Sequence, residues 1–214
     1  MRTHALLLVL LLGACASAKT DTFTLSSVPP ARQARGVPLH PPMEMGEVSI
    51  PATMDRNEIV LAAPGDRLDV ASNSIWGAPV RQLIRRALSD DLTARLPSGS
   101  VLPPGDPAPA AGLRILTVAI DQFSGDTSGH VVLSAAWILA PSGTPPTGVP
   151  HRERVEVNAG TGTPQAVVPA MSQALGALAD RIAASVSSLQ QAPASTAGRS
   201  PDRPRPARRR ARHG

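Results

Sequence analysis

Apolar residues alternate with polar ones, or form short uninterrupted runs, in several segments of the 214-residue chain. A period of two is typical of β-strands, and it predicts strands over 22–26, 47–50, 58–62, 67–71, 112–123, 130–139 and 152–159. Between the third and fourth of these, Pro64 favours the corner of a tight turn and Gly65 can adopt a positive φ. We therefore expect a hairpin over 58–71.

Two longer segments repeat apolar residues every three or four positions, which is the period of an α-helix. The first, 74–96, includes Trp76, and either Asn73 or Ser74 can cap its start. The second, 163–189, could be read as a coiled-coil seam, but a core face beside a sheet is the simpler interpretation. Its stripe consists of Val168, Met171, Leu175, Leu178, Ile182, Val186 and Leu189.

The order of these elements is strands, helix, strands, helix. It predicts an α+β fold with a mostly antiparallel or mixed sheet and two amphipathic helices packed on one face. We expect this domain to occupy residues 45–190. Because aromatic residues make up only 2% of the chain, aliphatic side chains must build most of the core, with four bulky members: Phe23, Trp76, Phe123 and Trp137.

The N-terminus has the features of an export signal. A short basic start precedes the apolar run 5–12, which is far shorter than the roughly 20 residues that span a bilayer. Residues 12–15 (LGAC) resemble the lipobox of bacterial lipoprotein precursors, which predicts a signal peptide over 1–14 and lipidation of Cys15 with acyl chains such as palmitate. The alternative is an ordinary cleaved signal with a cut near 14–18.

Lipidation of Cys15 would place the protein in the bacterial envelope. Two or three acyl chains anchor a protein stably in a membrane, whereas one binds only marginally. The residue after Cys15 is Ala16 rather than the aspartate that usually retains a lipoprotein at the inner membrane. We therefore expect an outer-membrane anchor that faces the periplasm, followed over 15–44 by a Pro-rich connector.

The formal charge of +5 does not belong to the predicted domain. The last 23 residues carry seven arginines and one aspartate, a net of +6, so the remainder of the chain has a net charge of −1. We expect the Arg/Pro-rich tail, 191–214, to be disordered. Export argues against nucleic acid as its target, which leaves anionic lipid, an acidic partner or a solvated terminus with no task.

The sequence contains no pattern that predicts an enzyme, a metal site or a cofactor site. Cys15 is the only cysteine, the histidines are scattered, and no nucleotide-binding or nucleophile motif occurs. Asp55-Arg56 and Asp121 invite a catalytic interpretation, but neither has a second catalytic group at a fixed spacing. A turn or an interface ion pair explains Asp55-Arg56 better. A periplasmic hydrolase using Asp55, Asp121 or His130 remains the least supported hypothesis.

Four stretches resemble the ABC-type transport auxiliary lipoproteins, the PqiC-like group. They are Phe23-Thr24-Leu25, GEVSIPATMDRNEIV (46–60), IWGAPVRQLIRRALSDDLTARLP (75–97) and AVVPAMSQALGALADRIAASV (166–186). They follow one another in the family's order. Phe23 stands where the family usually has Tyr, and the arginine tail lies outside the pattern.

The resemblance implies a non-catalytic subunit of a transporter that supports membrane integrity. Such lipoproteins work with a periplasmic MCE-domain protein and an inner-membrane ABC permease and ATPase that move lipids between the two membranes, and a homo-oligomeric ring is one expected arrangement. By the same resemblance, Asp55, Arg56 and Trp76 are the candidate partner-binding residues. The alternative is a stand-alone envelope lipoprotein that binds lipid or glycan by itself and has an apolar cavity for it.

Overall fold

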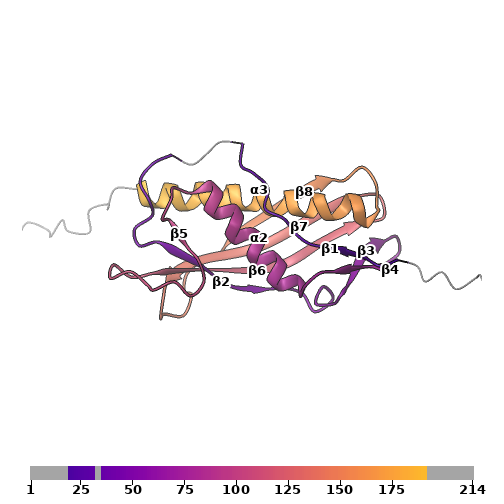
Figure 1. Ribbon diagram of the computed structural model, residues 1–214, viewed down its shortest axis with the longest axis horizontal. Coiled ribbons are helices and arrows are strands. Elements are labelled where there is room, and N and C mark those ends of the chain that lie inside the picture. The colour runs from indigo at the N-terminus through magenta and orange to yellow at the C-terminus, as the bar shows by residue number, and fades with distance from the viewer. Residues whose placement is uncertain (1–18, 32–34, 192–214) are drawn as a thin grey trace, which may run out of the picture.

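The computed structural model describes residues 19–31 and 35–191. Within them the chain forms one mixed sheet and two helices, an α+β arrangement in which both helices lie against the sheet (Figure 1). Cys15 and most of the arginine tail lie outside the described residues. In chain order the elements are β1 (Asp21–Phe23), β2 (Met43–Ser49), β3 (Glu58–Ala63), β4 (Arg67–Trp76), α2 (Val80–Arg95), β5 (Val101–Leu102), β6 (Arg114–Asp126), β7 (His130–Pro141), β8 (His151–Asn158) and α3 (Pro164–Gln191).

Strand β6 is the centre of the sheet. One of its edges pairs with β7 in a long antiparallel ladder, and β7 pairs in turn with β8. Its other edge is shared by two strands, because β2 runs parallel to the first half of β6 and β3 runs parallel to its last residues. The longest ladders are therefore antiparallel, but four of the pairings, including those of β1 with β4 and of β2 with β5, are parallel.

The predicted hairpin over 58–71 is confirmed. Strands β3 and β4 pair antiparallel around a turn in which Gly65 and Asp66 both have positive φ, at 74° and 58°. Pro64 precedes them, and proline is a residue that favours turns because its ring fixes φ. The hairpin and β1 lie at one end of the long axis of the molecule, and the last turn of α3 lies at the other end (Figure 1).

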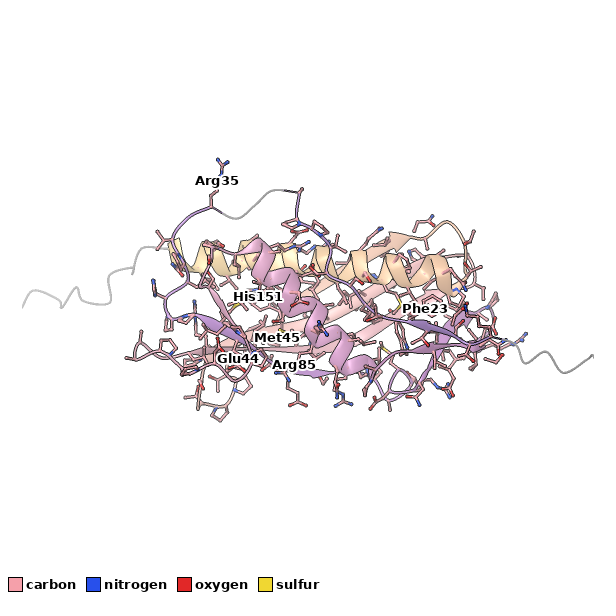
Figure 2. All side chains as sticks on the ribbon, viewed as in Figure 1. Phe23, Arg35, Glu44, Met45, Arg85 and His151 are labelled. Atoms are coloured by element: carbon pink, nitrogen blue, oxygen red, sulfur yellow. The ribbon has the colours of Figure 1, made fainter. Side chains whose placement is uncertain are left out.

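The helices cover the inner face of the sheet and bury its apolar side chains. Met45 on β2 lies beneath α2 (Figure 2) and is 1% exposed. On α3, the predicted stripe is buried from Val168 to Val186, but its last member, Leu189, is 57% exposed. None of the described helices is long and apolar enough to cross a membrane.

The prediction for Trp76 was wrong. Residues 74–76 continue β4 instead of starting a helix, since they pair in parallel with β1, a contact that no local pattern reveals. The helix begins only after Pro79, which occupies the N-cap position without a side-chain hydrogen bond. Proline is tolerated at the start of a helix because its missing amide hydrogen has no partner there. Neither Asn73 nor Ser74 caps α2.

The connector after β1 is held to the helix layer by a buried ion pair. Asp91 of α2 accepts hydrogen bonds from the Ser27 hydroxyl and the Val28 amide, at 2.9 and 2.8 Å. Arg95, one turn later, donates to both the Asp91 carboxylate and the Val28 carbonyl, at 3.0 and 2.9 Å. The segment that leads back toward Cys15 is therefore fixed to α2 at this point.

Candidate functional site

The sheet has a gap between β2 and β3, on the edge of β6 that the two strands share. The last β2–β6 pair is Ser49 with Ala119, and the first β3–β6 pair is Leu61 with Gly125. The chain uses twelve residues to cover a stretch that β6 covers in six. The surplus leaves the sheet as the loop 50–57, and no strand of the described chain pairs with residues 120–124 of β6 on this edge.

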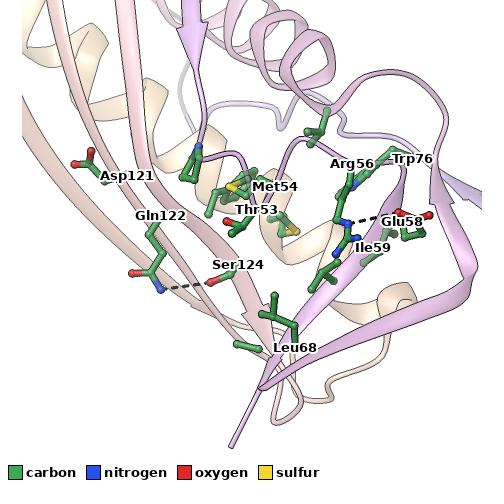
Figure 3. Close-up of a pocket in the computed structure, with 16 residues that line it drawn as sticks. Thr53, Met54, Arg56, Glu58, Ile59, Leu68, Trp76, Asp121, Gln122 and Ser124 are labelled. Carbon is green, nitrogen blue, oxygen red and sulfur yellow. Dashed lines mark hydrogen bonds and ion pairs between the residues drawn. The ribbon is translucent and has the colours of Figure 1, made fainter. Parts of the chain in front are cut away.

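A cavity of about 230 Å³ occupies the gap, and we call it the sheet cleft (Figure 3). It lies between β3, β6 and the loop, and its walls come from both faces of the sheet. The inner walls are buried side chains of the core, namely Ile59, Trp76, Val80, Phe123 and Met171. The outer walls are side chains on the face away from the helices, among them Val60, Ala62, Leu68 and Ser124.

The rim of the sheet cleft carries charges of both signs. Arg56 and Glu58, both lining it, form an ion pair of 3.5 Å (Figure 3), and both side chains are about 40% exposed. Asp55 points to α2 instead, where it pairs with Arg81 at 2.9 Å. Exposed pairs of this kind contribute roughly 0–1 kcal/mol to stability, so the fold does not depend on them.

The structure brings together the three residues predicted to bind a partner. Asp55 and Arg56 lie in the turns of the loop, and the Trp76 amide donates to the carbonyl of the adjacent Asn57 at 2.8 Å. Arg56 and Trp76 both line the sheet cleft. Asp55 and Arg56 do not pair with each other; each pairs with a different residue.

The residues of the hydrolase hypothesis are each engaged elsewhere. Asp121 lies at the rim and pairs with Arg152 of β8 at 3.4 Å. His130 begins β7, where its ring contacts Glu156 at 3.3 Å. No group of three His, Cys, Asp or Glu side chains within 19–31 and 35–191 is arranged to hold a metal ion.

Sequence reasoning missed the apolar outer face of the β3–β4 hairpin. Leu68 and Val70 are 55% and 42% exposed, and in the hairpin they stand opposite Ala62 and Val60. The signal was present in the letters IVLAA (59–63), a continuous apolar run that is typical of a strand covered on both faces. Here only the inner face is covered by the rest of the described chain.

The sequence matches the family described as "ABC-type transport auxiliary lipoprotein component" over residues 23–183. It is also similar to the intermembrane transport lipoprotein PqiC of Escherichia coli K12 and to that of Shigella flexneri, with 28% identity over 93 residues in each case. These matches cover 44% of this chain and 48% of each relative, so the similarity spans about half the length of the curated relatives.

Two solved structures share the fold. A crystal structure of an uncharacterized protein superposes with a TM-score of 0.63 at 20% identity, covering 79% of this chain and 99% of the other. A Xanthomonas campestris protein superposes with a TM-score of 0.62 at 15% identity, covering 81% and 98%. The match over residues 23–183, which includes the loop with Asp55 and Arg56, decides the assignment: the chain belongs to the ABC-type transport auxiliary lipoprotein family.

Proposed function

We propose that this protein is a non-catalytic lipoprotein subunit of an ABC/MCE-type intermembrane lipid transport system. In this proposal Cys15 carries the lipid anchor, the protein sits at the outer membrane facing the periplasm, and the domain docks the periplasmic MCE-domain protein and so supports envelope integrity. The family match carries the proposal, since the PqiC relatives are intermembrane transport lipoproteins. In this proposal the arginine tail, which lies outside the described residues, supplies positive charge for anionic lipid or an acidic partner.

The rim of the sheet cleft is our candidate for the docking surface. Arg56 and Glu58 of the rim, and Asp55 beside them in the loop, are exposed or half-buried and form pairs that add little to folding. Because these ion pairs are accessible to solvent, each side chain can leave its present partner and pair with a charged residue of another protein. The adjoining Leu68 supplies apolar area of the kind that is buried in the centre of an interface.

The test is co-purification of the tagged full chain from detergent-solubilised envelopes, with mass spectrometry of what accompanies it. We expect an MCE-domain protein and its permease with the wild type, and much less of both with Arg56→Glu. The matched control is Arg86→Glu, which reverses an exposed arginine of α2 that also has an acidic partner, Asp90. Equal recovery with both variants would remove Arg56 from the interface.

The rival function is a stand-alone envelope lipoprotein that binds lipid without a transporter partner. One observation favours it, namely the largely apolar sheet cleft. A preparation that contains bound lipid but no partner, even after mild crosslinking, would decide for this alternative. Loss of folding in Arg56→Glu would instead mean that the loop is structural.

A further inference from the structure

We propose that the sheet cleft holds one acyl chain of a phospholipid, which enters from the outer face of the sheet and ends against the helix layer. The inference rests on the proposed function, since it requires a protein anchored at a membrane through Cys15. It adds to that function a site at which this subunit itself contacts the transported class of molecule.

The shape of the sheet cleft fits a slender apolar chain. The gap in the sheet gives the cleft two kinds of wall, half-exposed side chains near its mouth and buried ones at its inner end, where Val80 of α2 and Met171 of α3 close it. Methionine adapts to irregular apolar partners, and two methionines, Met54 and Met171, line the cleft. A blind apolar opening of this kind excludes a charged headgroup from its inner end.

The volume of the sheet cleft is large enough for part of one acyl chain but too small for a whole lipid. An apolar cavity of about 150 Å³ stays dry and accepts benzene, and pockets for drug-sized ligands begin at about 300 Å³. The sheet cleft, at about 230 Å³, lies between these values. It therefore has room for part of a single unbranched alkyl chain, while the remainder of the lipid stays outside.

The residues around the mouth of the sheet cleft are complementary to the parts of the lipid that stay outside it. The exposed Leu68 and its neighbour Val60 extend the apolar wall outward from the cleft along the hairpin. The rim offers the Arg56 guanidinium together with the Glu58 and Asp121 carboxylates. A rim with both signs of charge is complementary to a zwitterionic headgroup, whose phosphate and ammonium groups can each meet an opposite charge.

Chain length places the sheet cleft near a membrane. Cys15 precedes Asp21, the first residue of β1, by six residues, which can span at most about 20 Å. Strand β1 pairs with the end of β4, where Phe23 stands opposite Trp76, a wall of the cleft. With Cys15 anchored, the mouth therefore stays within reach of lipids in the same leaflet. This nearness favours a lipid over a soluble peptide as the occupant.

The two tryptophans allow a direct test. Trp76 lines the sheet cleft, whereas Trp137 is buried elsewhere, stacked on His151 with ring centroids 4.1 Å apart. The full lipidated chain with Trp137→Phe is reconstituted into vesicles of phosphatidylethanolamine and phosphatidylglycerol. In one set, the phosphatidylethanolamine carries bromine near the ends of its acyl chains, because bromine quenches tryptophan on contact. We expect Trp76 to lose fluorescence in the brominated vesicles, and Trp137 in the Trp76→Phe chain to keep it.

Blocking variants separate entry into the sheet cleft from mere nearness to the bilayer. Ala62→Phe fills the outer wall of the cleft, and Val60→Phe does so from a neighbouring position if the first variant fails to show a cooperative melt. Val70→Phe is the matched control, on the same strand face but outside the cleft. We expect the blocking variants to abolish the quenching and Val70→Phe to keep it. Quenching that persists in all variants would overturn the inference.

The remaining outcomes distinguish the inference from the proposed function. No quenching, with the MCE-domain protein still recovered by the same chain, refutes the acyl-chain site alone. A second pattern would be no quenching together with partner recovery that is lost in Ala62→Phe and kept in Val70→Phe. This pattern would mean that the sheet cleft binds a side chain of the partner, and it would also refute the acyl-chain site. A chain that does not sediment with the vesicles has no anchor at Cys15, and both proposals then fail together.

Discussion

Removing the guanidinium of Arg95 should destabilise the protein far more than removing any exposed arginine. The Arg95 side chain is 4% exposed and pairs with the fully buried Asp91 carboxylate at 3.0 Å and with the exposed Asp180 carboxylate of α3 at 2.7 Å. Breaking a buried ion pair by truncating one partner typically costs about 3–5 kcal/mol, because the other charge stays buried without compensation. In Arg95→Ala, the Asp91 carboxylate would keep its hydrogen bonds from Ser27 and Val28. We therefore expect a loss near the lower limit, about 3 kcal/mol.

The control for this prediction lies on the same helix. Arg86 and Asp90 form a pair with the same spacing along α2, but their nitrogen and oxygen are 3.9 Å apart and their side chains are 84% and 57% exposed. Such pairs contribute little, and arginine and alanine differ little in helix propensity. Arg86→Ala should therefore change the free energy of unfolding by less than about 0.5 kcal/mol. Urea unfolding followed by tryptophan fluorescence measures both variants.

The pH dependence gives the prediction a second, independent signature. Burial raises the pKa of Asp91 above its ordinary value of 3.8, against the opposing effects of its hydrogen bonds and of Arg95. Without Arg95 the native pKa should rise further. A native pKa above the unfolded one means that the folded state binds the proton more tightly, so stability increases as the pH falls through the native pKa. The deficit of Arg95→Ala should therefore shrink on acidification, and a deficit no larger than that of Arg86→Ala, or one independent of pH, would refute the reasoning.

Three further predictions concern the turns and the anchor. Asp126→Ala should lower stability by about 1 kcal/mol at neutral pH, because the carboxylate accepts hydrogen bonds from the amide and hydroxyl of Ser128. These hydrogen bonds lower the native pKa of Asp126. The stability difference in urea unfolding should therefore disappear as the pH falls below 3.8 and through that native pKa. Gly162→Ala should cost about 1–3 kcal/mol in the same assay, since a Cβ there would overlap the backbone of Thr127. Cys15→Ala should leave the chain unlipidated and outside the membrane fraction; acyl chains found on the variant by mass spectrometry would contradict the anchor.

The sequence predicts most elements of this fold because their patterns are local. The alternation in 130–139 and the helical stripe in 163–189 each require only neighbours along the chain, and the structure has β7 and α3 there. Local pattern also explains why Trp76 was predicted to lie in a helix, since the four-residue spacing between Trp76 and Val80 continues the helical period. The strand character of Trp76 comes from pairing with β1, more than fifty residues away in the sequence, and a single sequence carries no signal for that pairing.

The sheet cleft could not be predicted, although each of its parts was visible. The apolar run 59–63 predicted a strand, and Asp55-Arg56 was interpreted as a turn or an interface ion pair. What creates the cleft is the register in which β2 and β3 divide one edge of β6 between them. Register between distant strands depends on tertiary packing. The sequence could therefore identify Arg56 and Trp76 as candidate binding residues, but it could not show that both line one cleft.

The two ion-pair networks of the domain differ in burial, and the difference separates residues that stabilise the fold from residues that are available for binding. Asp91 and Arg95 are buried and bind the connector to the helix layer, so their loss should act on folding. The pairs at the rim, including Arg56 with Glu58, are half-exposed and should act on folding hardly at all. Selection for stability alone would not require charges at the gap in the sheet or an uncovered apolar hairpin beside it. Binding would, and this supports the proposal that the domain acts through the sheet cleft and not through its more strongly bonded helix face.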